Sequence, residues 1–219
     1  MPDSATFWNN IAEGYAKSKI RDERAYEEKL KITQDLFPPN AHVLEIACGT
    51  GTTALHHAPH VETYQATDIS PRMLEIAREK ASAQGITNVL FSEEDIATAA
   101  WPADHYDAVL AMSILHLLPD RPAALARIRE TLKPGGSFIS STICLGNMSF
   151  LFPMLIGAMK LVGKAPKVVH RLSHEDLAAA ITEAGFIVED HRRMSKGSIA
   201  FIVARKPEEA VGAKLQAGQ

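Results

Sequence analysis

The sequence predicts an α/β fold in which helices cover both faces of a doubly wound, mostly parallel sheet. Two observations carry this prediction. Short apolar strands alternate with helical segments along the chain, and the first strand runs directly into a glycine turn that opens a helix. That turn lies between Val43 and Leu55, where the chain reads VLEIACGTGTTAL, and the next apolar strand ends on Asp68. In folds of this kind, such a turn and such an acid together form a nucleotide pocket.

The elements follow from local patterns. The polar N-terminal region 7–36 is expected to be helical and to end at Pro38-Pro39, and its run RDERAYEEKL is expected to be a solvated helix face. Ser70 and Pro71 are good N-cap and N1 residues for a later helix. Strands are expected near 42–47, 62–67, 88–92, 106–111, 136–142, 186–191 and 198–204, and helices near 52–58, 71–84, 122–132 and 174–184.

The last two strands are separated only by a short turn around Ser195-Lys196-Gly197. Strands joined so closely pair as an antiparallel hairpin, because a parallel pair needs a long crossover connection. A hairpin at the end of the sheet is not what a nicotinamide-binding half-domain predicts.

Composition is that of one α/β domain with room for an added segment. The chain has 219 residues, 46% of them hydrophobic, and a net charge of −3, which gives no reason to expect nucleic-acid binding. It has two cysteines and an N-terminus without a basic and apolar leader, so a cytoplasmic protein is expected. His56, His57 and His60 lack an acidic partner at ligand spacing, and we expect surface histidines and no metal site.

The glycine turn carries the strongest chemical signal. Gly49 and Gly51 allow a tight turn and a close approach of the backbone to a ligand, because they lack a Cβ atom. Glu45 lies at the mouth of the turn, where its charge repels phosphates and suits a cationic ligand. Asp68 lies where a carboxylate can accept hydrogen bonds from both hydroxyls of a ribose.

Further motifs give the chain a family resemblance. They read EEDIA at 93–97, YDAVLAMSILHLL at 106–118, LKPGGSFISST at 132–142, and then AGFIVED and SIAFIVARK. With these the sequence resembles the class I S-adenosylmethionine-dependent methyltransferases of the small-molecule "methyltransferase type 11" kind, over roughly residues 40–205. The resemblance implies a Rossmann-like sheet of seven strands in the order 3-2-1-4-5-7-6, with strand 7 antiparallel. Ala47 departs from the family pattern, since it replaces the first glycine of the turn.

The resemblance also implies a cofactor site for S-adenosyl-L-methionine, which leaves as S-adenosyl-L-homocysteine. In the family the acid matched by Glu45 binds the methionine amino group, and the pair matched by Asp95-Ile96 binds adenine. Tyr15 matches a tyrosine of the leading helix that closes over the cofactor, where a ring near a sulfonium gains cation–π attraction. The full set of expected cofactor-binding residues is Tyr15, Glu45, Ala47, Cys48, Gly49, Gly51, Asp68, Ile69, Met73, Asp95, Ile96, Met112 and Ser113. For several of them a structural reading stays open: capping for Asp68, core packing for Ile69, and a solvated acidic cluster for Asp95.

Methyl transfer to a hydroxyl or an ammonium requires loss of a proton, for which a general base helps. His116 follows the fourth strand on the site side and is the candidate catalytic base, with packing against Leu117 and Leu118 as the alternative. The segment 144–170 is rich in Met, Leu and Phe and falls where the fold admits insertions over the active site. It reads as an apolar lid, a lipid-contacting surface, or a helix packed on the core or on a dimer partner. The expected substrate-binding residues are Phe150, Phe152, Met154 and His170.

The expected organisation is an N-terminal helical cap over 1–39, a methyltransferase domain over 40–205 with an apolar insertion at 144–170, and a flexible tail over 206–219. The expected function is transfer of a methyl group to O, N or S of a small, rather apolar acceptor. Two alternatives stay open: methylation of a phospholipid or lipid headgroup with transient contact to a membrane surface, and a non-catalytic cofactor-binding domain that acts through a partner. The sequence leaves monomer and homodimer open.

Overall fold

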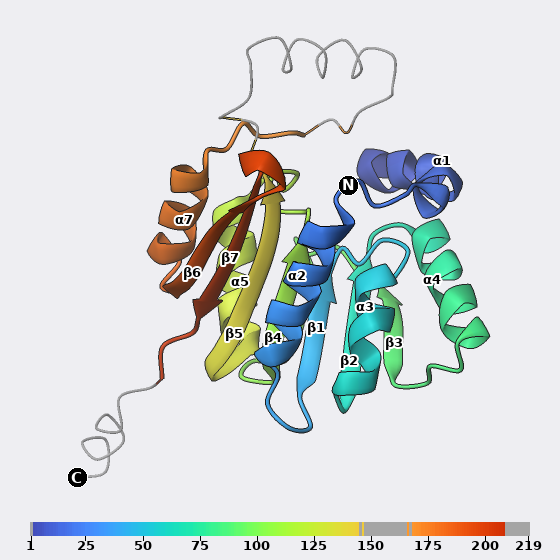
Figure 1. The fold of residues 1–219 in the computed structure, drawn as a ribbon, viewed down its shortest axis with the longest axis horizontal. Coiled ribbons are helices and arrows are strands. Elements are labelled where there is room, and N and C mark those ends of the chain that lie inside the picture. The colour runs from blue at the N-terminus through green and yellow to red at the C-terminus, as the bar shows by residue number, and fades with distance from the viewer. Residues whose placement is uncertain (1, 145, 147–165, 167, 209–219) are drawn as a thin grey trace.

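The computed structural model describes residues 2–144, 146, 166 and 168–208 (Figure 1). The predicted substrate residues Phe150, Phe152 and Met154 lie outside this described part, as do most of the 144–170 segment and residues 209–219 of the expected tail.

Seven strands form one sheet in the order β3-β2-β1-β4-β5-β7-β6. Strands β1 to β5 are parallel to one another, and β7 is antiparallel to both of its neighbours, β5 and β6. This confirms the predicted order and the terminal hairpin. The strands are β1 (His42–Ile46), β2 (Thr63–Asp68), β3 (Val89–Glu93), β4 (Tyr106–Met112), β5 (Leu132–Ile143), β6 (Ile187–Met194) and β7 (Ile199–Arg205).

Helices cover both faces of the sheet, as predicted. In Figure 1 the helices α2 and α3 cross the near face and α5 lies behind the sheet. The N-terminal region forms two helices, and Asp22 caps the second by accepting from Ala25 N. The described helices are α1 (Pro2–Lys17), α2 (Glu23–Asp35), α3 (Thr52–His57), α4 (Pro71–Ala83), α5 (Arg121–Thr131) and α7 (His174–Glu183), with 3₁₀ turns η1 (Ala58–His60) and η3 (Ser195–Gly197).

The sheet separates two apolar layers, because successive side chains of a strand point to opposite faces. In β5, for example, Phe138 belongs to the layer shared with α5 and α7, whereas Ile139 belongs to the layer shared with α2, α3 and α4. The central strands β1 and β4 are therefore buried on both sides, whereas the edge strand β3 is largely exposed.

Helix α1 lies beyond the carboxyl ends of the strands, next to the start of α4 (Figure 1). Ala12 packs there with Met73 and Ile76 in a small core of its own. Asn9 adds a polar contact, since its Oδ1 accepts from Ser70 Oγ at 2.7 Å. These contacts attach α1 to the edge of the sheet at which β1, β2 and β4 end.

The expectation that all three clustered histidines lie at the surface is wrong for His57. Its side chain is fully buried beneath Phe37, with ring centroids 5.2 Å apart, while His56 and His60 are exposed. Burial, and then the charges of His56 and His60, lower the pKa of His57 to about 3. The neutral imidazole of His57 therefore packs as an apolar ring. The segment 52–58 is too short to show a periodicity that would predict this burial.

Candidate cofactor and acceptor site

The glycine turn after β1 has the conformation of a tight ligand-binding loop. Ala47, Gly49 and Gly51 have φ values of 56°, 55° and 74°, and Gly51 is the N-cap residue of α3. A Cβ at Gly51 would lie 2.8 Å from Ala77 Cβ, so close packing against α4 requires glycine there. At Gly49 a Cβ would meet only Tyr15, at 3.6 Å. The positive φ of Gly49 and its open side therefore suit a turn that a ligand approaches.

The carboxylate of Asp68 holds the turn in place. Its Oδ2 accepts from Gly49 N at 2.8 Å, and its Oδ1 accepts from Ser70 N at 2.9 Å. Burial raises the pKa of Asp68, and the backbone hydrogen bonds oppose that rise. Each carboxylate oxygen can accept more than one hydrogen bond, so these contacts leave acceptor capacity for a ligand.

Glu45 is a buried carboxyl with a neutral partner. Its side chain is 1% exposed, and its Oε2 accepts from Tyr64 Oη at 2.9 Å. Burial and, to a lesser extent, the charge of Asp68 raise the pKa of Glu45 to about 8, although the hydrogen bond from Tyr64 opposes the rise. A buried carboxyl without a cation is costly to ionise, so a ligand that brings a positive charge to Glu45 gains an ion pair in a low-dielectric site.

Tyr15 of α1 joins these groups from above the turn. Its ring is half-exposed and contacts the edge of Trp8, with centroids 6.3 Å apart. Burial, followed by the charges of Asp68 and Glu45, raises the pKa of Tyr15. The structure thus brings together Tyr15, Glu45, Gly49 and Asp68, four of the residues singled out from the sequence.

The remaining cofactor candidates occupy varied positions. Asp95 accepts from Ala97 N at 2.8 Å in the turn after β3, and Ile96 is buried in the core. Ile69 is partly buried beside Asp68, and Cys48 is buried within the turn itself. Met73 is fully buried in the contact between α4 and α1, so its side chain packs the two helices together.

At the carboxyl end of β4, Met112 is partly buried and Ser113 is exposed. Ser113 has a φ of 63°, and its N–H donates to Ser141 O at 2.6 Å. His116 follows in a turn and is buried, with Nδ1 unpartnered among the described residues. Burial, and then the charge of His170, lower the pKa of His116 to about 4.

His170 lies beside His116, as the two backbone segments are hydrogen-bonded. His170 N donates to His116 O at 2.8 Å, and its Nε2 donates to Leu118 O at 2.9 Å. The predicted catalytic base lies in the loop after β4, and one predicted substrate residue lies in the segment before α7. The structure places the two side by side.

The expectation that the run 21–30 is a solvated face is wrong for the side of α2 that carries Ala25, Tyr26, Lys29 and Leu30. The hydroxyl of Tyr26 lies 3.4 Å from Oγ1 of Thr53, at the start of α3. Lys29 Nζ donates to Ser141 Oγ at 3.1 Å. Both side chains are partly buried, on the face of α2 that also buries Ala25 and Leu30. Tyr26 and Lys29 are three residues apart and adjoin these apolar positions, and this spacing is the sequence pattern that could have predicted their burial.

The described residues contain neither a cluster of metal-ligating side chains nor a membrane-spanning helix. No group of three or more His, Cys, Asp or Glu side chains within that part of the chain could hold a metal ion. Likewise, none of the helices described above combines the length and the hydropathy that crossing a membrane requires.

The sequence of this chain is similar to those of known methyltransferases and polyketide synthases. A family model described as a methyltransferase domain matches residues 43–136. A ubiquinone biosynthesis O-methyltransferase of Xanthomonas axonopodis is 30% identical over 165 residues, which cover 73% of this chain and 68% of that protein. A highly reducing polyketide synthase of Emericella nidulans is 30% identical over 154 residues, which cover 64% of this chain; the chain spans only 6% of that synthase's length.

Among solved structures, a SAM-dependent methyltransferase from Aquifex aeolicus matches with a TM-score of 0.69 and 16% identity, covering 89% of this chain and 97% of that one. This likeness shows the fold. Together with the family-model match and the O-methyltransferase relative, it means that the chain belongs to the class I S-adenosylmethionine-dependent methyltransferases.

Proposed function

We propose that the chain binds S-adenosylmethionine and transfers its methyl group to an O, N or S atom of a small, rather apolar acceptor. The observation that carries this proposal is the pair of buried carboxyls beside one glycine turn: Glu45 in the strand before it and Asp68, which accepts from Gly49 N. The cofactor is a cation that carries an ammonium, a sulfonium and a ribose. The residues present fit it: Glu45 lacks a cationic partner among the described residues, and Asp68 retains acceptor capacity.

The roles of the site residues follow from this fit. Glu45 binds the ammonium and Asp68 the ribose hydroxyls, while Asp95 and Ile96 contact adenine. Met112 and Ser113 line the sulfonium region, and the ring of Tyr15 covers it. The bound cofactor supplies an electrophilic methyl group. The remaining expected contacts come from the glycine turn, at Ala47, Cys48, Gly49 and Gly51, and from Ile69 next to Asp68.

The protein contributes chiefly position. Holding a nucleophile in line with the methyl group supplies about 7–11 kcal/mol of the barrier reduction when the orientation is good. His116 accepts the acceptor's proton where one must leave, and the lowered pKa keeps its imidazole neutral near pH 7. His170 and the apolar residues Phe150, Phe152 and Met154 are proposed to bind the acceptor.

An oxygen acceptor is favoured over nitrogen or sulfur, because the relative from Xanthomonas axonopodis is named as an O-methyltransferase. We also propose a cytoplasmic protein that uses no nucleic acid, with the helical cap 1–39 over the domain 40–205. Methylation of a lipid headgroup at a membrane surface, and a non-catalytic cofactor-binding role, are the competing functions.

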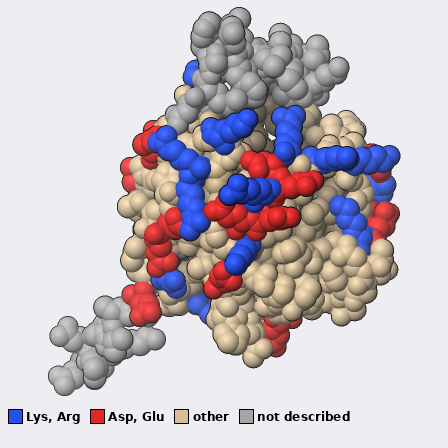
Figure 2. All heavy atoms as spheres, viewed as in Figure 1, with Lys and Arg blue, Asp and Glu red and all other residues tan. Residues whose placement is uncertain are grey.

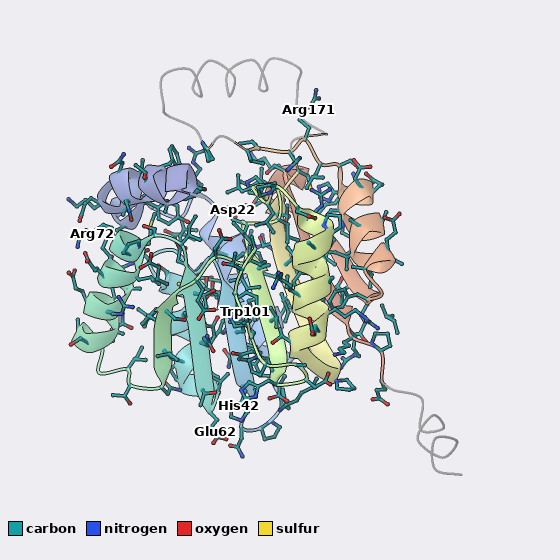
Figure 3. The ribbon with its side chains drawn as sticks, turned by 180° about the vertical axis from the view of Figure 1, so that it is seen from behind. Asp22, His42, Glu62, Arg72, Trp101 and Arg171 are labelled. Carbon is teal, nitrogen blue, oxygen red and sulfur yellow. The ribbon has the colours of Figure 1, made fainter. Side chains whose placement is uncertain are left out.

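Calorimetric titration with S-adenosylmethionine, S-adenosylhomocysteine and NAD tests the proposal. We expect the two sulfur nucleosides to bind and NAD not to. Asp68→Asn should weaken their binding by about 1.5–3 kcal/mol, because it removes charged hydrogen bonds. Glu62→Gln is the matched control, since Glu62 is exposed at the opposite edge of the sheet (Figure 3).

Tight NAD binding without a signal for either sulfur nucleoside would contradict the proposal. Incubation with labelled cofactor and a cell extract, followed by mass identification of the product, then separates the competing functions. A methylated lipid supports the headgroup reading, and cofactor binding without any methylated product supports the non-catalytic one.

A further inference from the structure

A lysine of α2 reaches the acceptor side of the site. Lys29 Nζ donates to Ser141 Oγ at 3.1 Å, and Ser141 is paired with Met112 across the β4–β5 ladder. The carbonyl of the same serine accepts from Ser113 N at 2.6 Å. The ammonium therefore stands at the carboxyl ends of β4 and β5, one strand away from the residues proposed to line the methyl group.

The same helix face also reaches the glycine turn. Tyr26 lies three residues before Lys29, with its hydroxyl 3.4 Å from Thr53 Oγ1 and its ring centroid 5.9 Å from Lys29 Nζ. Burial raises the pKa of Tyr26, and the charge of Glu45 adds to that rise. One face of helix α2 thus contacts both the start of α3, through Tyr26, and β5, through Lys29.

The ammonium of Lys29 has no ion pair among the described residues. Its hydrogen-bond partner is a neutral hydroxyl, and the nearest acid that influences it is Asp22. Asp22 is already engaged, because its carboxylate accepts from Ala25 N at 3.1 Å and from the side chain of Ser195. Partial burial lowers the pKa of Lys29, and the negative charge of Asp22 opposes this lowering. A partly buried cation with unused donors favours an anionic ligand.

We propose that Lys29 binds an ionised oxygen of the acceptor, such as a phenolate, an enolate or a carboxylate, beside the methyl group. The inference rests on the proposed function and names its substrate class. An oxyanion bound by Lys29 would experience two positive charges, that ammonium and the sulfonium of the bound cofactor, and both favour its ionised form.

The reaction balances with this acceptor. The acceptor's proton leaves to solvent or to His116 before transfer. The oxygen lone pair then forms the O–C bond while the S–C bond breaks, and the electron pair of that bond stays on sulfur. A neutral ether or ester and a neutral thioether result, so two opposite charges disappear from a partly buried site. Lys29 acts as a specificity-determining residue in this scheme.

The test uses 4-nitrophenol, whose ionised and protonated forms absorb at different wavelengths. It is titrated against the full chain saturated with S-adenosylhomocysteine, so no turnover is required. Lys29 should lower the pKa of the bound phenol by about 1–3, which is at least a tenfold preference for the ionised form. Its methyl ether, 4-nitroanisole, cannot ionise and should bind at least about tenfold more weakly.

Matched variants assign the effect to this side chain. Lys29→Met keeps the apolar stem and should abolish the preference, and Lys29→Arg should restore most of it. Lys31→Met removes an equal charge from an exposed position of the same helix and should change nothing. Figure 2 shows basic and acidic side chains interspersed over this face, so the loss of one exposed charge is a fair control. Unfolding curves for each variant separate binding effects from misfolding.

Failure of this inference is distinct from failure of the proposed function. If S-adenosylhomocysteine binds but the phenol shows no preference for its ionised form, or keeps that preference in Lys29→Met, the inference is wrong and the function stands. If S-adenosylhomocysteine itself does not bind, the proposed function fails first. Preferred binding of the protonated phenol would make Lys29 a neutral base and would also overturn the inference.

Discussion

Residues at the site differ in how directly the sequence reveals them. Glu45, Gly49, Gly51 and Asp68 stand within one motif and its following strand, so their proximity was predictable from the parallel-sheet arrangement. The proximity of Lys29 to the site was not predictable from the sequence. It depends on which face of α2 packs against β5, a strand far away in the sequence. Local pattern specifies turns and caps well, but it specifies contacts between distant elements poorly.

Glu45 should make stability depend on pH. Its pKa is raised to about 8, so the folded protein holds a proton that the unfolded chain loses above about 4.5. The free energy of unfolding should therefore fall as pH rises from about 4.5 to 8, by at most about 1.4 kcal/mol per pH unit. Denaturant unfolding of the wild type and of Glu45→Gln at pH 5 and pH 7.5 measures this.

In Glu45→Gln that part of the slope should be absent, because the amide cannot ionise. Glu62→Gln should keep the wild-type slope, since Glu62 is exposed. Equal slopes in wild type and Glu45→Gln would show that the buried carboxyl is ionised in the folded protein throughout.

His116→Ala should lower turnover by roughly 10²–10⁴, the usual loss for a general base, with little change in cofactor affinity. The pKa of about 4 places the rise of the rate with pH near pH 4, below the ordinary range of histidine. A pH–rate profile with an ionisable acceptor measures both effects. Near-normal turnover in the variant would make His116 a packing residue and leave the catalysis to positioning.

Elements were predictable where caps and periodicity agree. Ser70 and Ser173 cap α4 and α7 as their sequences indicate, and the hairpin of β6 and β7 follows from its short turn. The expected helical N-terminal region is divided into two helices, and Asp22 caps the second. The division matters because it lets α1 lie over the carboxyl edge while α2 lies on the face of the sheet (Figure 1).

Helix α1 gives the element-scale prediction. Tyr15→Ala should weaken S-adenosylmethionine binding more than S-adenosylhomocysteine binding, because only the former carries a sulfonium and the cation–π contribution is about 0.5–2 kcal/mol. Tyr15→Phe keeps the ring and should retain most of the affinity. Calorimetry with both ligands measures the difference. Equal losses for the two ligands, or none, would argue that α1 is a packing element.

For the whole molecule, the sheet order was predicted and the resemblance that implied it is now family membership. The site could be located because open α/β sheets bind ligands at the carboxyl ends of their strands. The identity of the acceptor could not be predicted, because the side chains proposed to recognise it come from elements that meet only in the folded chain. Lys29, Ser113 and Ser141 illustrate this, as they come from three elements and share one hydrogen-bonded corner.

The placement of β7 between β5 and β6 also bears on how the chain is made. Translation proceeds from the N-terminus at about 5–20 residues per second, so β5 and β6 emerge before the strand that separates them. Until β7 has left the ribosome and docked, β5 lacks its partner on that side, and an unpaired strand edge is a template for pairing with another chain. The ribosome thus completes the residues of the cofactor turn early, while protection of the sheet against aggregation waits for its last described strand.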